Sequence, residues 1–393
     1  MIPLCTDLNP QQLGQFFTPT FIVDTMLGLM ENYGSILEPS CGNGSFLDHL
    51  PNHAIGIEID PSVIKNKNVK NIDFFAYGAE NKFDTIIGNP PYIAHKNIPP
   101  NTKNLLMPYK NIFDHRSNLY LFFIFKSILH LKQKGELIFI TPRDFLKLTA
   151  ATKLNHFLYQ NGTITDFIDL GDKKIFDNAQ PNCAIWRFEK NNFTRKTNIL
   201  KNFNCHQGQI TFTNASYPIL FKDLFFVKVG AVSGNDKLFT HSVFGNEDFV
   251  CSHTCKTNKT KKMIYNQYHP FLEAHKQALI NRKIRKFTQS NWWQWGRDYF
   301  KSDCPRIYVN TKTRNKQPFF IHPTKAYDGS ILAIFPRFQT DSSLLKEICD
   351  LFNHTNWEEL GFVCDGRFLF SQKSLENCSL GENFARFYSL KKL

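Results

Sequence analysis

The sequence predicts an α/β domain over residues 1–190 and a basic domain of mixed α and β structure over residues 191–393. Three observations predict this division. Apolar strand-like and amphipathic helix-like stretches alternate through the first half, which is typical of a parallel sheet with helices on both faces. After residue 190, helical patterns become scarce and aromatic and Asn/Lys-rich stretches dominate. The charge changes there too, since residues 1–190 hold 18 Lys and Arg against 18 Asp and Glu, whereas residues 191–393 hold 29 against 16.

The composition is that of a globular chain. With 393 residues, 42% of them hydrophobic, it is long enough for two domains that each have a core. The longest apolar run, residues 119–131, is interrupted by Lys126 and is too short to span a membrane, and residues 1–10 lack the pattern of a secretory signal. The ten cysteines are scattered singly, and the pair that flanks His253 has no partner pair at zinc-finger spacing. We therefore expect reduced thiols, no metal site and a cytoplasmic location.

The first element in chain order is a helix over residues 21–33, which Thr20 can cap and in which apolar residues recur at helical spacing. A strand over 35–38, a short helix over 45–50 and a strand over 54–59 follow. The later segments of the first half predict a strand over 83–88, a helix over 118–131, a strand over 135–141, a helix over 144–160, and strands over 163–170 and 182–188.

Unusual segments follow three of these strands. They are the loop with Gly42 and Gly44, the carboxylate Glu58, and residues 89–92. Because ligands of parallel α/β sheets bind at the carboxyl ends of the strands, we expect these segments to lie together. Residues 94–117 form a long polar connection, and connections of this length are usually functional or mobile.

The glycine turn differs from a dinucleotide-binding turn. Its third glycine position is Leu47, and the acidic Glu38 precedes the turn. The negative charge of Glu38 would repel a pyrophosphate, but it would attract a ligand that carries an ammonium and a sulfonium. Glu58, at the end of the next strand, can accept hydrogen bonds from both ribose hydroxyls of an adenosine. Asp73 can accept from an adenine amino group while Phe74 packs on the ring, although for this pair taken alone a loop acid beside a core aromatic is the favoured interpretation.

The segment Asn89-Pro90-Pro91-Tyr92 presents acceptors to an amine. Two adjacent prolines fix the backbone and remove two N–H donors, which leaves the Asn89 side-chain oxygen and the Pro90 carbonyl. Both can accept from one planar NH2 group while Tyr92 stacks on the ring that bears it. Such hydrogen bonds localise the nitrogen lone pair and stabilise the cation that forms when the nitrogen is alkylated. The alternative is a rigid turn that merely ends a strand.

Together these residues resemble the N6-adenine DNA methyltransferases of type II restriction–modification systems, in the Taq-type group. The resemblance covers residues 12–190 and is carried by Gln15-Phe16-Phe17-Thr18-Pro19, Glu38-Pro39-Ser40-Cys41-Gly42, Glu58, Asp73-Phe74, Asn89-Pro90-Pro91-Tyr92 and Asn118-Leu119-Tyr120. It implies a Rossmann-like class I methyltransferase domain, followed by a mixed α+β target-recognition domain that residues 229–235 match only loosely. It also implies that S-adenosylmethionine is the cofactor. The cofactor-binding residues that it implies are Thr18, Glu38, Pro39, Ser40, Cys41, Gly42, Glu58, Ile59, Asp73, Phe74, Asn89 and Pro91.

The same resemblance implies how DNA is handled. The target adenine would leave the duplex and stack on Tyr92 and a second aromatic, which we assign to Phe176. Trp186 is an alternative, although its place in a strand favours the core. Phosphate contacts would come from the basic residues of 256–262, 282–286 and 312–316, about half of which we expect to be merely solvated. We expect a monomer that shares its site with a separate restriction endonuclease.

Other functions remain open. The tetrapeptide also fits methyl transfer to a guanine amine of ribosomal RNA or to a glutamine of a release factor, but those families usually place substrate-binding parts before the catalytic domain. A nucleic-acid-binding protein with a decayed catalytic domain is disfavoured by intact Glu38, Glu58, Asp73, Asn89 and Tyr92. A dinucleotide-dependent oxidoreductase is disfavoured by the missing third glycine. A nuclease domain fused to the methyltransferase-like domain is not supported by the sequence. We find no cluster of carboxylates and lysine that is surrounded by enough residues to form a domain.

Overall fold

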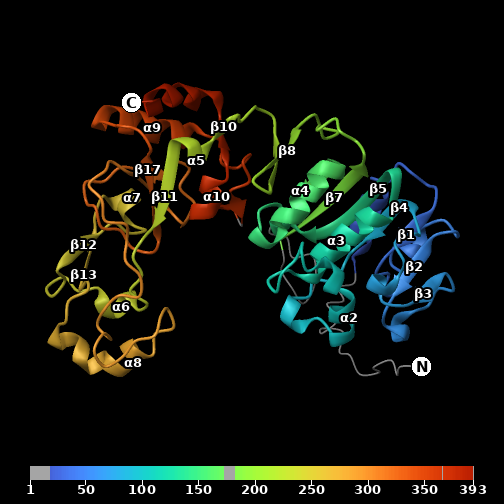
Figure 1. The fold of residues 1–393 in the computed structure, drawn as a ribbon, viewed down its shortest axis with the longest axis horizontal. Helices are drawn as coiled ribbons and strands as arrows, with labels where there is room; N and C mark the ends of the chain where they lie inside the picture. Colours follow the sequence, from blue (N-terminus) through green and yellow to red (C-terminus); the bar gives the residue numbers. More distant parts are fainter. Residues whose placement is uncertain (1–17, 172–181, 365, 393) are drawn as a thin grey trace. The chain divides into compact units, whose positions relative to one another are not determined.

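The computed structural model describes residues 18–171, 182–364 and 366–392 (Figure 1). The chain divides into two compact units, residues 1–214 and 215–393. None of the helices in the described ranges is both long and apolar enough to cross a membrane.

A seven-stranded sheet forms the centre of the first unit, in the order β3-β2-β1-β4-β5-β7-β6. Its strands are β1 (Ile36–Glu38), β2 (Ile55–Glu58), β3 (Val69–Asn71), β4 (Phe83–Gly88), β5 (Leu131–Pro142), β6 (Gly162–Asp169) and β7 (Cys183–Lys190). The α-helices are α1 (Thr20–Leu27), α2 (Pro100–Leu105), α3 (Leu119–His130) and α4 (Thr152–Asn161). Short 3-10 helices lie between them: η1 (Leu47–His49), η2 (Pro61–Val63), η3 (Phe74–Ala76), η4 (His95–Asn97), η5 (Met107–Tyr109), η6 (Arg143–Leu146) and η7 (Thr149–Ala151).

Helices cover both faces of this sheet, as expected. Alternate residues of the strands point to opposite faces, so that Ile86 of β4 joins the core under α3 and α4 while Ile87 joins the core under α1. In Figure 1, α3 and α4 lie across the sheet. This architecture confirms the α/β fold class with a Rossmann-like sheet that was expected for the first half.

The sheet departs from the expected fully parallel arrangement at one strand. β7 runs antiparallel to both of its neighbours, β5 and β6. It is the next strand after β6 among the described residues, and it pairs with β6 along its length. The helix expected over residues 144–160 is also interrupted. Its first part forms η6 and η7, because Asn155 in α4 donates through Nδ2 to the carbonyls of Phe145 and Leu146.

The first unit extends beyond the expected boundary near residue 190. Residues 202–213 form a hairpin of β8 (Asn202–His206) and β9 (Gln209–Thr213). Phe203 and Ile210 of this hairpin are buried in the core of the first unit, and Asn155 Nδ2 donates to the carbonyl of Gly208 at 2.8 Å. The first unit therefore ends at residue 214, because the hairpin is packed on α4.

The second unit is mixed α and β, as expected. A sheet in the order β11-β17-β14-β16 packs against α9, whose buried face carries Leu345, Ile348, Cys349 and Phe352. Its strands are β10 (Ile219–Leu220), β11 (Phe225–Val229), β12 (Glu247–Phe249), β13 (Lys261–Met263), β14 (Ile307–Asn310), β15 (Lys312–Thr313), β16 (Phe319–Phe320), β17 (Ile331–Pro336), β18 (Val363–Cys364), β19 (Arg367–Leu369) and β20 (Ser379–Leu380). Its helices are α5 (Phe221–Leu224), α6 (Asp236–Phe239), α7 (Thr254–Thr257), η8 (Pro270–His275), α8 (Lys276–Ile280), α9 (Ser342–His354), α10 (Gln372–Glu376) and η9 (Glu382–Lys392).

Candidate active site

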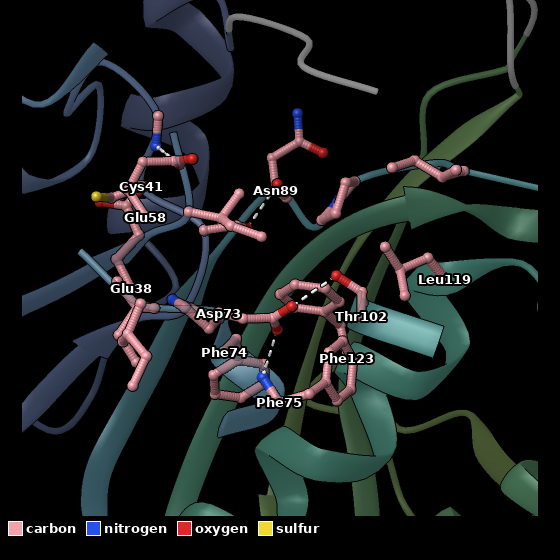
Figure 2. A pocket seen from close by; sticks show the side chains of 18 of the residues that line it. Glu38, Cys41, Glu58, Asp73, Phe74, Phe75, Asn89, Thr102, Leu119 and Phe123 are labelled. Atoms are coloured by element: carbon pink, nitrogen blue, oxygen red, sulfur yellow. Dashed lines mark hydrogen bonds between the residues drawn. The ribbon is translucent and has the colours of Figure 1, made fainter. Parts of the chain in front are cut away.

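A pocket of about 920 Å³, open to solvent, lies at the carboxyl ends of β1, β2 and β4 (Figure 2). Parallel strands bring their carboxyl ends to one edge, so segments separated in the chain meet there. All twelve residues expected to bind the cofactor line this one pocket: Thr18, Glu38, Pro39, Ser40, Cys41, Gly42, Glu58, Ile59, Asp73, Phe74, Asn89 and Pro91. Their binding roles stay predictions.

The glycine loop is tied to the end of β2. Gly42 has a φ of +52°, and its N–H donates to Glu58 Oε2 at 2.7 Å. The N–H of Asp60 donates to Glu58 Oε1 at 2.8 Å, so both carboxylate oxygens are held by the main chain. Burial raises the pKa of Glu58, and the same main-chain N–H groups oppose that shift. Glu58 is thus fixed at the pocket wall with lone pairs to spare for further donors.

Glu38 is a buried carboxylate that lacks a full set of partners. It is 2% exposed, and its Oε2 has no hydrogen-bond partner within the described ranges. Burial raises the pKa of Glu38 well above its usual value, the N–H of Leu47 opposes this, and the charges of Glu58 and Asp48 add to it. A buried acceptor without a donor is costly, and a cationic ligand group would supply the missing partner. The donor set therefore fits a ligand with an ammonium at this end of the pocket.

Asp73 lies at the other end of the pocket and is held from two sides. Its Oδ1 accepts from the N–H of Phe75 at 2.8 Å, and its Oδ2 accepts from the hydroxyl of Thr102 at 2.6 Å. Figure 2 shows both contacts. Thr102 belongs to α2, inside the polar connection over residues 94–117, so this segment supplies a wall of the pocket. The sequence indicated that the connection was functional, but it did not identify Thr102.

Aromatic and apolar side chains complete the pocket near Asp73. Phe74 is buried and stacks on Phe123 of α3, with ring centroids 5.1 Å apart. Phe75, Leu119 and Phe123 also line the pocket, and they were missed. The spacing of Leu119 and Phe123, four residues apart in an expected helix, was the available signal that both share a face.

Asn89 is oriented by two contacts with the pocket wall. Its Nδ2 donates to Thr18 Oγ1 at 3.3 Å, and its carbonyl accepts from Ser40 Oγ at 3.2 Å. The first contact sets which way the amide faces, and the second fixes the main chain where β4 ends. Asn89 and Pro91 line the pocket, whereas Pro90 and Tyr92 are not among its lining residues.

Tyr92 is anchored away from the pocket. Its hydroxyl donates to the main-chain carbonyl of Ile140 on β5 at 3.0 Å, and its ring meets that of Tyr120 edge-on at 5.9 Å. Tyr120 in turn donates to Asp144 Oδ1 at 2.9 Å. Burial raises the pKa of Tyr92 well above its usual value, so the phenol is neutral near pH 7. These contacts fix the plane of the ring.

The second stacking aromatic remains a prediction. Phe176 and the motif residues Gln15, Phe16 and Phe17 lie outside the described residues. The alternative, Trp186, is fully buried, and its Nε1 donates to Thr141 Oγ1 at 3.0 Å. Trp186 is therefore a core residue, as its place in the strand indicated.

The basic clusters of the second unit separate into two groups. Arg282 is buried and donates to the carbonyls of Leu279, Ser233, Trp292 and Gln294, so it is structural. Lys261 forms ion pairs with Asp236 and Asp328. The exposed members of the three clusters are Lys256, Lys259, Lys262, Lys283, Arg285, Lys286, Lys312, Arg314 and Lys316. These nine are the cations that a polyanion can reach.

Comparison with known proteins points to one family. The family model "Eco57I restriction-modification methylase" matches residues 42–176. The type II methyltransferase M.HincII of Haemophilus influenzae is 39% identical over 197 residues, which cover 48% of this chain and 39% of that protein. The type II methyltransferase M.TthHB8I of Thermus thermophilus is 30% identical over 198 residues, which cover 46% of each protein. The matched segment thus spans less than half the length of these curated relatives.

A solved structure extends the likeness in fold to the second unit. The type IIL restriction-modification enzyme MmeI, in complex with DNA, aligns with a TM-score of 0.56 and 11% identity, covering 96% of this chain and 66% of that one. At such an identity the likeness concerns the fold alone. The sequence matches concern the first unit: residues 42–176, which contain the glycine loop and the Asn-Pro-Pro-Tyr segment, match the family model, and this part of the chain is similar to type II methyltransferases.

Proposed function

We propose that this protein transfers a methyl group from S-adenosylmethionine to the N6 amino group of an adenine in duplex DNA, as the modification activity of a restriction–modification system. One observation carries the proposal. Asn89-Pro90-Pro91-Tyr92 directly follows β4, beside a pocket lined by Glu38, Glu58 and Asp73. A site for a charged adenosine derivative and a site for a planar amine therefore adjoin each other.

Different pocket residues bind different parts of the cofactor. Glu38 offers its unpartnered oxygen to the ammonium of the methionine part. Glu58 accepts from the ribose hydroxyls, and Asp73 accepts from the adenine amino group while Phe74 packs on the ring. When bound, S-adenosylmethionine supplies a methyl group on a sulfonium, whose departure leaves a neutral thioether.

Asn89 and Pro90 act on the target amine. The Asn89 side-chain oxygen and the Pro90 carbonyl accept its two N–H groups, which localises the nitrogen lone pair for attack. Both dipoles are fixed before the reaction, so they stabilise the positive charge that develops on nitrogen without reorganising. The proton leaves after the transfer, and no strong base is needed beforehand. Tyr92 stacks on the ring of the target base.

DNA as the substrate is supported by charge and by the relatives. The nine exposed cations of the three basic clusters can contact phosphates and set the register on the duplex. An adenine N6 is paired inside the duplex, so the base must be flipped out, at a cost of about a few kcal/mol. Stacking on aromatic side chains offsets about 1–3 kcal/mol of that cost. We further propose that the protein acts as a monomer and that a separate endonuclease recognises the same DNA site.

The proposal is tested by locating the methyl group. The protein is incubated with tritiated S-adenosylmethionine and unmethylated plasmid, and the DNA is digested to nucleosides and separated. We expect the label in N6-methyl-2′-deoxyadenosine. Label in another nucleoside, in added ribosomal RNA or release factor instead of DNA, or in nothing at all, would overturn it.

Cofactor binding is expected to release a proton from Glu38. The pKa of Glu38 is raised in the free protein, and a bound ammonium lowers it. At a pH between the pKa of Glu38 in the free protein and its pKa in the complex, binding of the cofactor releases the proton. The affinity for the cofactor therefore rises with pH across this range. Titration calorimetry below pH 7, in buffers of different ionisation enthalpy, measures the release. Adenosine, which lacks the ammonium, and Glu38→Gln should release no proton; a buffer-independent heat for the wild-type protein with S-adenosylmethionine would contradict the role.

The Tyr92→Ala substitution is expected to slow methylation about tenfold to a hundredfold, because it removes a stacking surface for the flipped base. The cofactor dissociation constant should stay within about twofold of wild type, since Tyr92 is not among the pocket-lining residues. Methylation kinetics and calorimetry provide the two values. Tyr92→Phe keeps the ring and loses the hydroxyl contacts, with the carbonyl of Ile140 and with the thiol of Cys183, so it should be much less impaired. A loss of cofactor affinity in Tyr92→Ala would reassign the residue to the cofactor.

A further inference from the structure

We propose that Lys126, in the middle of α3, is a positioning residue that fixes the turn against which the adenine of the cofactor binds. The inference rests on the proposed function, because it assigns Lys126 to the adenosine part of the S-adenosylmethionine pocket. In the sequence, this lysine is the interruption in the longest apolar run.

The Lys126 ammonium is buried and binds main-chain atoms. The residue is 2% exposed, and its Nζ donates to the carbonyls of Phe74 at 2.6 Å and Tyr77 at 2.7 Å. These carbonyls belong to the first residue of η3 and to the residue that follows it. The Phe74 carbonyl also accepts from the N–H of Tyr77 at 3.1 Å, so Lys126 adds a second donor there and supplies a donor to the Tyr77 carbonyl at the end of the turn. One side chain of α3 therefore holds both ends of the turn.

Burial of the Lys126 ammonium carries a desolvation cost, which its contacts must offset. Desolvation by burial lowers the pKa of Lys126 to about 8, against the opposing charges of Asp73 and Glu80, and the group is charged at neutral pH. The Nζ also lies 5.0 Å and 5.7 Å from the ring centroids of Phe74 and Phe75, where each aromatic face attracts a cation. No carboxylate forms an ion pair with it among the residues that the structure describes. A methionine would fill the space without the cost of desolvation, but it would release both carbonyls.

The turn that Lys126 holds is a wall of the pocket. Asp73, Phe74 and Phe75 line the pocket, and Phe123, one helical turn before Lys126, stacks on Phe74. Thr102 holds Asp73 from α2. The adenine-binding groups are therefore clamped between α2 and α3. Without Lys126, the turn loses its hydrogen bonds to α3, and affinity for adenosine falls while the groups at Asn89 are unchanged.

The test measures binding separately from catalysis. Lys126→Met is expected to weaken binding of adenosine and of S-adenosylhomocysteine by the same factor, about tenfold, as measured by titration calorimetry. The Michaelis constant for S-adenosylmethionine should rise by a similar factor, while kcat at saturating cofactor stays within about twofold of wild type.

Lys190→Met is the matched control. Lys190 Nζ also donates to two main-chain carbonyls, those of Ile128 at 3.1 Å and Leu131 at 2.8 Å, but it contacts neither η3 nor the pocket. It should lose thermal stability and keep wild-type affinity. If Lys126→Met does not fold, Lys126→Gln against Lys190→Gln replaces the pair, with a several-fold loss of adenosine affinity expected in the first alone.

The outcomes separate this inference from the proposed function. A wild-type protein that binds neither adenosine nor S-adenosylhomocysteine overturns the proposed function. A wild-type protein that binds them, with a folded Lys126 variant of equal affinity, overturns the role of Lys126 alone. An equal loss of affinity in the Lys190 variant also overturns it, since the loss then reflects a general loosening of α3.

Discussion

Replacing Asn89 with alanine is expected to lower the rate of methyl transfer about a hundredfold to a thousandfold, while cofactor affinity changes far less. The variant loses a preorganised dipole aimed at the nitrogen on which charge develops, and loss of one such group typically costs this much. Thr18 and Ser40 hold the residue in place, so the wild-type amide needs no reorganisation before the reaction. Single-turnover methylation of plasmid DNA measures the rate, and titration calorimetry measures cofactor affinity.

Two further variants show whether the effect is specific to Asn89. Asn97→Ala, at an exposed asparagine in the segment that follows, should keep the wild-type rate. Thr18→Ala frees the Asn89 amide to rotate, so it should lose part of the rate but less than Asn89→Ala. If Asn89→Ala kept more than a tenth of the wild-type rate, the amine would be activated by other groups.

Replacing Glu136 with alanine is expected to lower the free energy of unfolding by about 3–5 kcal/mol, because it removes the buried carboxylate that pairs with the buried guanidinium of Arg187. Glu136 and Arg187 are buried, and Arg187 Nε donates to Glu136 Oε2 at 2.7 Å. Glu136 Oε1 also accepts from the N–H of Asn32 at 2.9 Å and from Thr85 Oγ1 at 2.9 Å, so one carboxylate on β5 joins β4, β7 and the chain before β1. Urea unfolding followed by circular dichroism measures the loss.

Two comparisons separate burial from charge. Glu31→Gln removes a second carboxylate that pairs with Arg187, but Glu31 is 63% exposed, so the expected loss is below about 1 kcal/mol. The double variant Glu136→Leu with Arg187→Leu should recover much of the stability, since an apolar pair carries no desolvation cost. Equal losses in Glu31→Gln and Glu136→Ala would show that the pair is not effectively buried.

The sequence predicted the pocket residues at the strand ends better than it predicted the helices that surround the pocket. β4 has the predicted bounds, 83–88, and the predicted binding residues meet because each follows a strand of one parallel sheet. Their order along the chain and the sheet topology suffice for this. Thr102 and Phe123 could not be located in the same way, because their place in the pocket depends on how α2 and α3 fold back over η3.

Three differences in the fold have separate physical causes. β3 is short and mostly exposed, so it lacks the apolar pattern of a strand. The reversal of β7 depends on pairing between segments, which no local pattern reports. Residues 191–214 resemble the second half in composition, yet Phe203 and Ile210 bury themselves in the first unit. In contrast, α9 was detectable, since its apolar residues recur at 345, 348, 349 and 352 with helical spacing.

The anchor of Tyr92 has a consequence for evolution and engineering. The hydroxyl binds the main-chain carbonyl of residue 140, not a side chain, so the identity of residue 140 does not enter the bond. The side chain at this position can drift among apolar residues of similar volume while the ring keeps its plane. The coupling between positions 92 and 140 is therefore invisible to covariation between homologous sequences. It also leaves Ile140, in the core beside the site, open to redesign.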